Sequence, residues 1–81
     1  PFNSGTQIKY TLENPSNITI QIVNMLGENI RSVDKGFKNA GNHLTYWNGK
    51  DDSQVESPSG IYFVVAETAR QLEVRKILLV K

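Results

Sequence analysis

The stretch Asn-Ile-Thr-Ile-Gln-Ile-Val, at residues 17–23, alternates branched apolar side chains with mostly polar ones. Successive side chains of a β-strand point to opposite faces of a sheet, so this alternation predicts a strand with one face in a core. The stretch Gln-Ile-Lys-Tyr-Thr-Leu, at residues 7–12, has the same period. Between them, Glu-Asn-Pro-Ser at residues 13–16 has the composition of a turn. The first part of the chain therefore predicts two strands joined by a turn.

Four more short strands are expected, at residues 29–35, 43–47, 61–68 and 72–80. Glycine, proline and asparagine punctuate the sequence between them, and residues 36–42 are expected to form a loop. No segment longer than a turn has helical periodicity. Short strands at this spacing predict an all-β fold, either an antiparallel sandwich or a barrel, in one domain over residues 1–81.

Three local features refine this expectation. Gly27 lies in the turn before the third strand and is expected to have a positive φ. Ile30 and Val33 depart from strict alternation, which indicates a bulge or a short strand. A seventh strand, if the fold has one, is expected near Phe2 or inside the loop of residues 48–59.

The core is predicted from the side chains that share the inward side of each strand. Trp47 is expected to anchor two sheets, since a large aromatic residue ends the fourth strand just before the polar loop Asn-Gly-Lys-Asp-Asp-Ser. The predicted core residues are Ile8, Tyr10, Leu12, Ile18, Ile20, Ile22, Leu26, Trp47, Tyr62, Val64, Ile77 and Leu79.

Composition excludes several classes of protein. A chain of 81 residues buries roughly 60–65% of its unfolded surface, which makes a small domain. Its net charge of +1 and its scattered basic residues argue against nucleic-acid binding. The absence of cysteine excludes disulfides and a thiolate nucleophile. No stretch has the ~20 apolar residues of a membrane-spanning helix, and we expect no stable membrane insertion. The abrupt start Pro-Phe-Asn is expected of a domain cut from a longer chain.

The residues that carry chemistry form no catalytic pattern. His43 is the only histidine, and no nucleophile or acid at a suitable spacing would make it a general base. Asp51 and Asp52 offer oxygen ligands for calcium, but they are adjacent and lack the EF-hand spacing, so a solvated turn is favoured. The glutamates are dispersed and form no pair for glycoside hydrolysis. We therefore expect no enzyme activity, no metal and no cofactor.

Two strands are apolar on both faces. Residues 61–66 and 77–80 consist entirely of apolar side chains, although only one face of each strand can meet the core. The other face must be covered by a loop or a neighbouring domain, or stay exposed. An exposed apolar strip commonly marks an interaction surface.

A second interpretation concerns sugar binding. Aromatic faces stack on pyranose rings, and the candidates for such a platform are Tyr46, Trp47 and Phe63. If Trp47 points inward, Tyr46 points outward by alternation, which leaves Tyr46 and Phe63 as an expected exposed pair.

The motifs, taken in order, resemble one family over the whole chain. They are Pro-Phe-Asn at 1–3, Ile-Lys-Tyr-Thr-Leu at 8–12, Asn-Met-Leu-Gly-Glu at 24–28, Ala-Gly-Asn-His at 40–43, Trp-Asn-Gly at 47–49, Ser-Gly-Ile-Tyr-Phe at 59–63 and Lys-Ile-Leu-Leu-Val-Lys at 76–81. The sequence resembles the type A C-terminal sorting domain of type IX secretion cargo in the Bacteroidetes, and the similar Ig-like domain of flagellar hook-capping proteins. It departs from the family at Gln54, where a loop glycine is usual, and at Ser57, where an aliphatic residue is usual.

The resemblance implies an Ig-like β-sandwich of six to seven strands that other proteins recognise. It implies a non-catalytic module that directs a passenger from the periplasm across the outer membrane, to the cell surface or the exterior. The expected partners are the type IX secretion machinery and a parent catalytic or adhesin domain, and the module is expected to be a monomer. The end at Lys81, directly after the closing motif, is expected of a true C-terminus.

Docking is expected through the last two strands. The residues assigned to it are Gly60, Tyr62, Lys76, Leu78, Val80 and Lys81. Two alternatives remain at this point: an accessory carbohydrate-binding module of an extracellular glycoside-degrading enzyme, and a structural spacer that packs on its parent domain.

Overall fold

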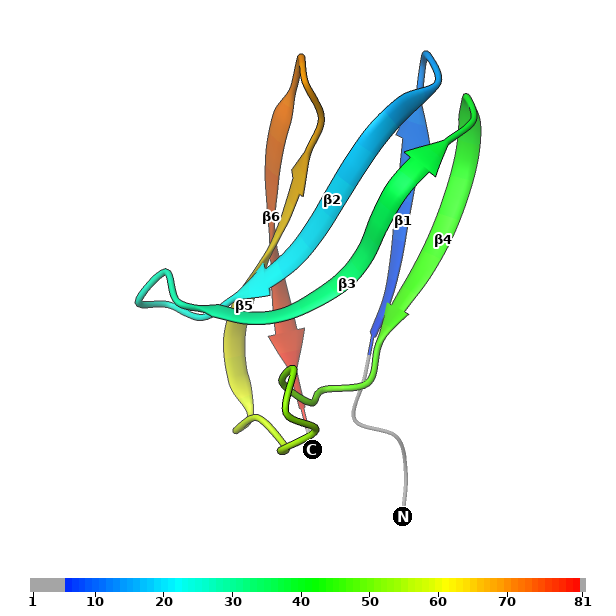
Figure 1. Ribbon diagram of the computed structural model, residues 1–81. Helices are drawn as coiled ribbons and strands as arrows, with labels where there is room; N and C mark the ends of the chain where they lie inside the picture. The colour runs from blue at the N-terminus through cyan, green and yellow to red at the C-terminus, as the bar shows by residue number, and fades with distance from the viewer. Residues whose placement is uncertain (1–5, 81) are drawn as a thin grey trace.

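The computed structural model describes residues 6–80 as six strands without a helix. The strands are β1 (Thr6–Leu12), β2 (Ser16–Val23), β3 (Asn29–Lys38), β4 (Gly41–Trp47), β5 (Gly60–Glu67) and β6 (Leu72–Leu79). β1 and β4 form a two-stranded antiparallel sheet, and the others form a four-stranded antiparallel sheet in the order β3-β2-β5-β6. Figure 1 shows the two sheets as separate layers. The predicted small antiparallel β-sandwich is confirmed.

β2 is the central element of the larger sheet. It pairs with β3 on one side and with β5 on the other, and its three isoleucines point into the core. The register with β3 shifts between Ile20 and Gln21 and again between Ile22 and Val23. An extra residue on one strand of a pair bends that strand and produces such shifts. The bulge predicted from the spacing of Ile30 and Val33 therefore exists.

The loop predicted over residues 36–42 is wrong. β3 continues to Lys38 and β4 already begins at Gly41, so only two residues connect them. β2 supplies the reason, because its first residues pair with the end of β3, with Ile18 opposite Gly36. Gly36 has a φ of +128° and still fits the ladder, since glycine has no Cβ to clash in that conformation. Pairing with β2 overrides the weak strand preference of this glycine-containing segment.

The core lies between the two sheets and matches the prediction closely. Ten of the predicted residues are buried, and Ile77 packs against them half-buried. Trp47 has no exposed surface, and its indole Nε1 donates a hydrogen bond to the Lys50 carbonyl (2.9 Å). Its ring packs edge-to-face with that of Tyr62, with 5.2 Å between the ring centroids. Trp47, the last residue of β4, thus connects this strand to the loop that follows it and to β5.

Leu26 was predicted in the core and is instead 83% exposed. The turn between β2 and β3 closes on itself through Asn24, whose side-chain oxygen accepts hydrogen bonds from the amides of Leu26 and Glu28. Gly27 follows with a φ of +84°, as expected from the sequence. The turn therefore projects Leu26 away from the sandwich, and Figure 1 shows this hairpin tip extending beyond both sheets.

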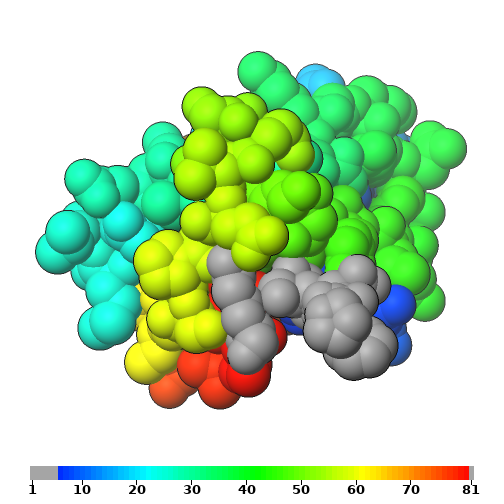
Figure 2. Space-filling view, turned by 90° about the horizontal axis from the view of Figure 1, so that it is seen from below, coloured from blue at the N-terminus to red at the C-terminus, as the bar shows by residue number. Residues whose placement is uncertain are grey.

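The segment between β4 and β5 closes one end of the sandwich. Figure 2 looks onto that end and shows the segment spread between the β2–β3 turn and β4. Within residues 48–59 the only strand-like pairing is one bridge, between Lys50 and Glu56. The alternative position for a seventh strand, near Phe2, lies outside the described residues.

Candidate functional site

The outer side of β5 and β6 is an apolar surface built by two neighbouring strands. Antiparallel register places Ile61 opposite Leu78, and Val65 opposite Val74. Because the core takes the alternate residues of each strand, these side chains point away from it. We call this surface the β5–β6 face, and its members are Ile61, Phe63, Val65, Leu72, Val74, Lys76, Leu78 and Val80.

The β6 half of this face is the more exposed half. Leu72, Val74, Leu78 and Val80 each expose more than half of their surface (65, 56, 63 and 67%). No segment within residues 6–80 covers them. Large apolar side chains gathered on one side of a small domain are typical of a surface that binds another protein. Of the alternatives open for the second face of the last strands, cover by a loop within residues 6–80 does not apply to the β6 half.

A lysine interrupts the apolar surface. Lys76 is exposed on β6 and lies opposite Phe63 of β5. β6 is also an edge strand, and a charged lysine on an edge strand opposes uncontrolled pairing with other chains. The β5–β6 face therefore combines an apolar contact area with a positive charge near its middle.

The residues predicted for docking do not all reach this face. Lys76, Leu78 and Val80 are exposed, and Leu78 lies on the face with Lys76. Tyr62 belongs to the core instead, because it is only 6% exposed and its hydroxyl donates to the Pro58 carbonyl at 2.6 Å. Gly60 begins β5 with a φ of +153°, which suits a residue without a Cβ. Lys81 lies outside the described residues.

The three aromatic residues considered for sugar stacking form no common platform. Trp47 is fully buried. Tyr46 is exposed on the outer side of β4, in the two-stranded sheet, whereas Phe63 lies half-buried on the outer side of β5, in the other sheet. The outer sides of a sandwich face in opposite directions, so the expected exposed pair of Tyr46 and Phe63 does not exist.

The acidic pair of the 48–59 loop holds the loop together. The Asp51 side chain accepts hydrogen bonds from the amides of Ser53 and Val55, both at 2.9 Å. Asp52 accepts from the Ser32 amide at 3.2 Å, which fastens the loop to β3. Within residues 6–80, no group of three or more histidine or acidic residues is arranged to hold a metal ion. These carboxylates accept hydrogen bonds within the loop and from β3, which gives them a structural role.

Gln54 occupies a conformation that favours glycine. Its φ is +66°, and it is the only residue other than glycine in the described chain with a positive φ. A side chain in the left-handed region costs roughly 1–2 kcal/mol, whereas glycine adds roughly 0.5–1 kcal/mol of chain entropy on folding. The departure from the family pattern noticed at this position therefore has a physical meaning: the loop keeps the backbone shape that a glycine would adopt.

We expect Gln54→Gly to stabilise the domain by about 0.5 kcal/mol, because it removes the strain at a small entropic cost. The midpoint of urea unfolding would rise accordingly. Ser53→Gly, at the neighbouring position without a positive φ, is the matched control and should lower the midpoint. Equal losses of stability in both variants would contradict the assignment of strain to Gln54.

His43 takes part in a cluster that ties the two sheets together. Its ring stacks on Tyr10 of β1 with 5.1 Å between the centroids, and its Nε2 lies 2.7 Å from the Asn39 carbonyl. Tyr10 in turn donates its hydroxyl to Asp34 of β3 at 3.0 Å. Burial first, then the hydrogen bond and the negative charge of Asp34, raise the pKa of Tyr10 to about 12. These contacts give His43 a structural role.

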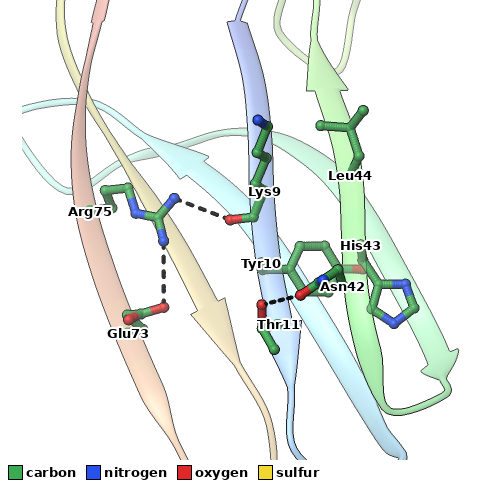
Figure 3. A pocket seen from close by; sticks show the side chains of 8 residues that line it. All are labelled: Lys9, Tyr10, Thr11, Asn42, His43, Leu44, Glu73 and Arg75. Atoms are coloured by element: carbon green, nitrogen blue, oxygen red, sulfur yellow. Dashed lines mark hydrogen bonds and ion pairs between the residues drawn. The ribbon is translucent and has the colours of Figure 1, made fainter.

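Sequence reasoning missed one feature, a groove of about 610 Å³ beside β1. It brings together residues of β1, β4 and β6 (Figure 3). Arg75 of β6 reaches across to donate to the Lys9 carbonyl at 3.2 Å, although the two residues are 66 positions apart. The sequence of a single strand does not predict such a groove, because the groove depends on how the edges of the two sheets approach each other.

Within the described residues, no helix could span a membrane.

Fold and topology together define an Ig-like β-sandwich. The family model of the FlgD Ig-like domain matches residues 2–71, and the chain belongs to that family. The crystal structure of FlgD from Pseudomonas aeruginosa has a TM-score of 0.73 to this chain at 23% sequence identity, which shows a common fold. The match covers 91% of this chain and 57% of that one, so this chain spans little more than half of that chain's length. No curated protein matches the chain.

Proposed function

We propose that this domain is a non-catalytic recognition module that directs a passenger protein across the outer membrane by docking on the type IX secretion machinery. The exposed β6 half of the β5–β6 face carries the proposal. Its apolar side chains give a partner a contact area that needs no rearrangement of the core. Residues 60–63 and 76–79, which belong to the two motifs that resemble those of sorting domains, lie on the same two strands.

The test is a fusion of residues 1–81 to a periplasmic reporter in a host with a working type IX system. We expect the reporter at the cell surface, measured by its accessibility to protease in intact cells. Retention of the reporter in the periplasm, with the domain shown to be folded, would contradict the proposal.

A pair of variants tests whether the β5–β6 face is responsible. Leu78→Glu puts a charge on this face and is expected to reduce surface delivery at least tenfold, since a buried unpaired carboxylate opposes docking. Leu44→Glu is the matched control, because Leu44 is exposed to a similar degree (58%, against 63% for Leu78) but lies on the other sheet. Both changes should alter stability by only about 0.5 kcal/mol. Equal loss of delivery in both variants would place docking elsewhere.

Membership of the FlgD Ig-like family favours one alternative, a role in flagellar assembly. In that case the module would act as a building block between other subunits. Replacing the matching segment of P. aeruginosa FlgD by this domain, and scoring motility, separates the two proposals. Restored motility, together with a reporter retained in the periplasm, would favour the assembly role.

A further inference from the structure

The free edge of β1 has unpaired backbone groups beside an open groove. β1 pairs only with β4, so the smaller sheet ends at β1. Hydrogen-bonded and non-hydrogen-bonded pairs alternate along an antiparallel ladder. The Lys9 carbonyl accepts its hydrogen bond from Arg75 across the groove, so Lys9 points its backbone groups away from β4. By the same alternation Gln7 and Thr11 do so too, and all three present an amide and a carbonyl to the edge.

Arg75 occupies the place of a neighbouring strand. Its guanidinium satisfies one carbonyl of the edge and lies 3.9 Å from Glu73 of the same strand. Figure 3 shows this side chain bridging from β6 to β1. Among residues 6–80, no backbone–backbone hydrogen bond reaches β1 from outside its own ladder. Besides Arg75, the Thr6 hydroxyl donates to this edge, at the Gln7 carbonyl (3.4 Å). Two side chains therefore contact an edge that could pair along its length.

A second and much smaller hollow, of about 10 Å³, shares Lys9 and Arg75 with the groove. Its walls include Ile8, Ile20 and Val64, which are core residues of three different strands. Core side chains therefore come close to the surface at the seam where the edge of β1 faces β6. Ig-like sandwiches have about seven strands or more, and the described residues provide six. A strand laid along β1 would both pair its backbone and cover this seam.

We propose that the edge of β1 binds an extended acidic segment of a partner protein by strand addition. Extended peptides bind free sheet edges through main-chain hydrogen bonds, and pockets for alternate side chains provide specificity. The inner side chains of the added strand would face the apolar seam beside Ile8. Its outer side chains would lie next to the exposed Lys9, which favours glutamate or aspartate at alternate positions.

This surface is independent of the proposed function. The β1 edge lies on the two-stranded sheet, whereas the β5–β6 face lies on the outer side of the other sheet. Strand addition can therefore fail while delivery through the β5–β6 face holds, and the converse is also possible.

The probe is a blocked heptapeptide that alternates valine and glutamate, Val-Glu-Val-Glu-Val-Glu-Val, added to the isotope-labelled chain. We expect backbone amide shifts concentrated at Gln7, Lys9 and Thr11, and at least tenfold slower hydrogen exchange of these amides at saturation. The same peptide N-methylated at its glutamates cannot pair with the edge and should not bind. A lysine-for-glutamate version should bind at least tenfold more weakly.

A matched pair of variants tests the charge. Lys9→Glu should weaken binding of the glutamate peptide at least tenfold, whereas Lys35→Glu, at an exposed position of β3, should leave it unchanged. Equal binding of the N-methylated peptide, shifts confined to β3 or β6, or no binding at millimolar peptide would each overturn the proposal. Slow hydrogen exchange of these amides in the free chain would also overturn the proposal. If it is present in dilute solution, the chain itself occupies the edge. If it grows with protein concentration, a second copy does.

Discussion

Replacing Trp47 by alanine is expected to abolish the cooperative unfolding transition of this domain. Truncating a buried tryptophan costs about 3–5 kcal/mol, since both apolar burial and packing are lost. The least stable small domains have only about 5 kcal/mol in total. Here the loss is compounded, because the Lys50 carbonyl loses its indole donor and Tyr62 loses the ring that it packs against. The end of the sandwich and the loop that closes it should loosen together.

Urea unfolding followed by far-UV circular dichroism measures this effect without relying on tryptophan fluorescence. Tyr46→Ala is the matched control, because Tyr46 is the neighbouring aromatic residue and points to solvent. Its replacement should change the free energy of unfolding by only about 0.5 kcal/mol. Trp47→Phe, which keeps a ring but lacks the indole nitrogen, should fall between the two. A cost below about 1.5 kcal/mol for Trp47→Ala would show that Trp47 does not anchor the sheets.

The strands and the core could be predicted from the sequence because burial imposes a period of two on a strand. Ile18, Ile20 and Ile22 alternate with residues that face outward, and each isoleucine is buried as that pattern requires. Trp47 could be assigned to the core from its size and its position at a strand end. In each case the signal lies within one short segment and does not depend on distant residues.

The errors occur where other segments decide the outcome. The residues from Gly36 onward appear as a loop by composition, but the start of β2 offers them a pairing partner. Leu26 has the character of a core residue, yet the side chain of Asn24 closes the turn so that Leu26 points outward. Tyr62 was assigned both to the core and, from a motif, to docking; its position in β5 turns it inward, as the core assignment requires. Composition describes what a residue prefers, whereas pairing and turn closure decide what it contacts.

Of the two surfaces proposed for binding, only one could be predicted from the sequence. The two-sided apolar character of the last strands pointed to the β5–β6 face, because a sandwich can bury only one side of each strand. The edge of β1 gave no such signal, since a free edge follows from strand order and not from side-chain type. The link between Lys9 and Arg75 joins opposite ends of the chain and appears only once both sheets are in place.

Alkaline pH is expected to destabilise the domain through Tyr10. The buried phenol donates to Asp34, which also forms an ion pair with Lys38 at 3.2 Å, and His43 stacks on the ring. Burial first, then the hydrogen bond and charge of Asp34, raise the pKa of Tyr10 to about 12 in the folded state. An unfolded tyrosine has a pKa of about 10. Between these two values the folded chain keeps the phenolic proton and the unfolded chain loses it.

The sign of the effect follows from the protons bound in each state. Stability changes with pH in proportion to the protons held by the unfolded state minus those held by the folded state. In this window the difference is negative for Tyr10, so stability falls as pH rises. The contribution of Tyr10 is fully present below about pH 10 and is lost by about pH 12. A difference of about two pH units corresponds to a loss of about 3 kcal/mol.

Urea unfolding of the wild type and of Tyr10→Phe, from about pH 9 to about pH 11.5, isolates this contribution. All other titratable groups are common to both proteins, so their contributions cancel in the difference. At about pH 9 the wild type should be more stable by about 1.5–3 kcal/mol, the value of a hydrogen bond to a charged acceptor, and this advantage should shrink as pH rises. Asp34→Asn removes the charge but keeps an acceptor. The stability of this variant should therefore decline over a narrower range of pH than that of the wild type. Parallel curves for the wild type and Tyr10→Phe would show that Tyr10 ionises near its ordinary pKa and that the cluster does not retain its proton.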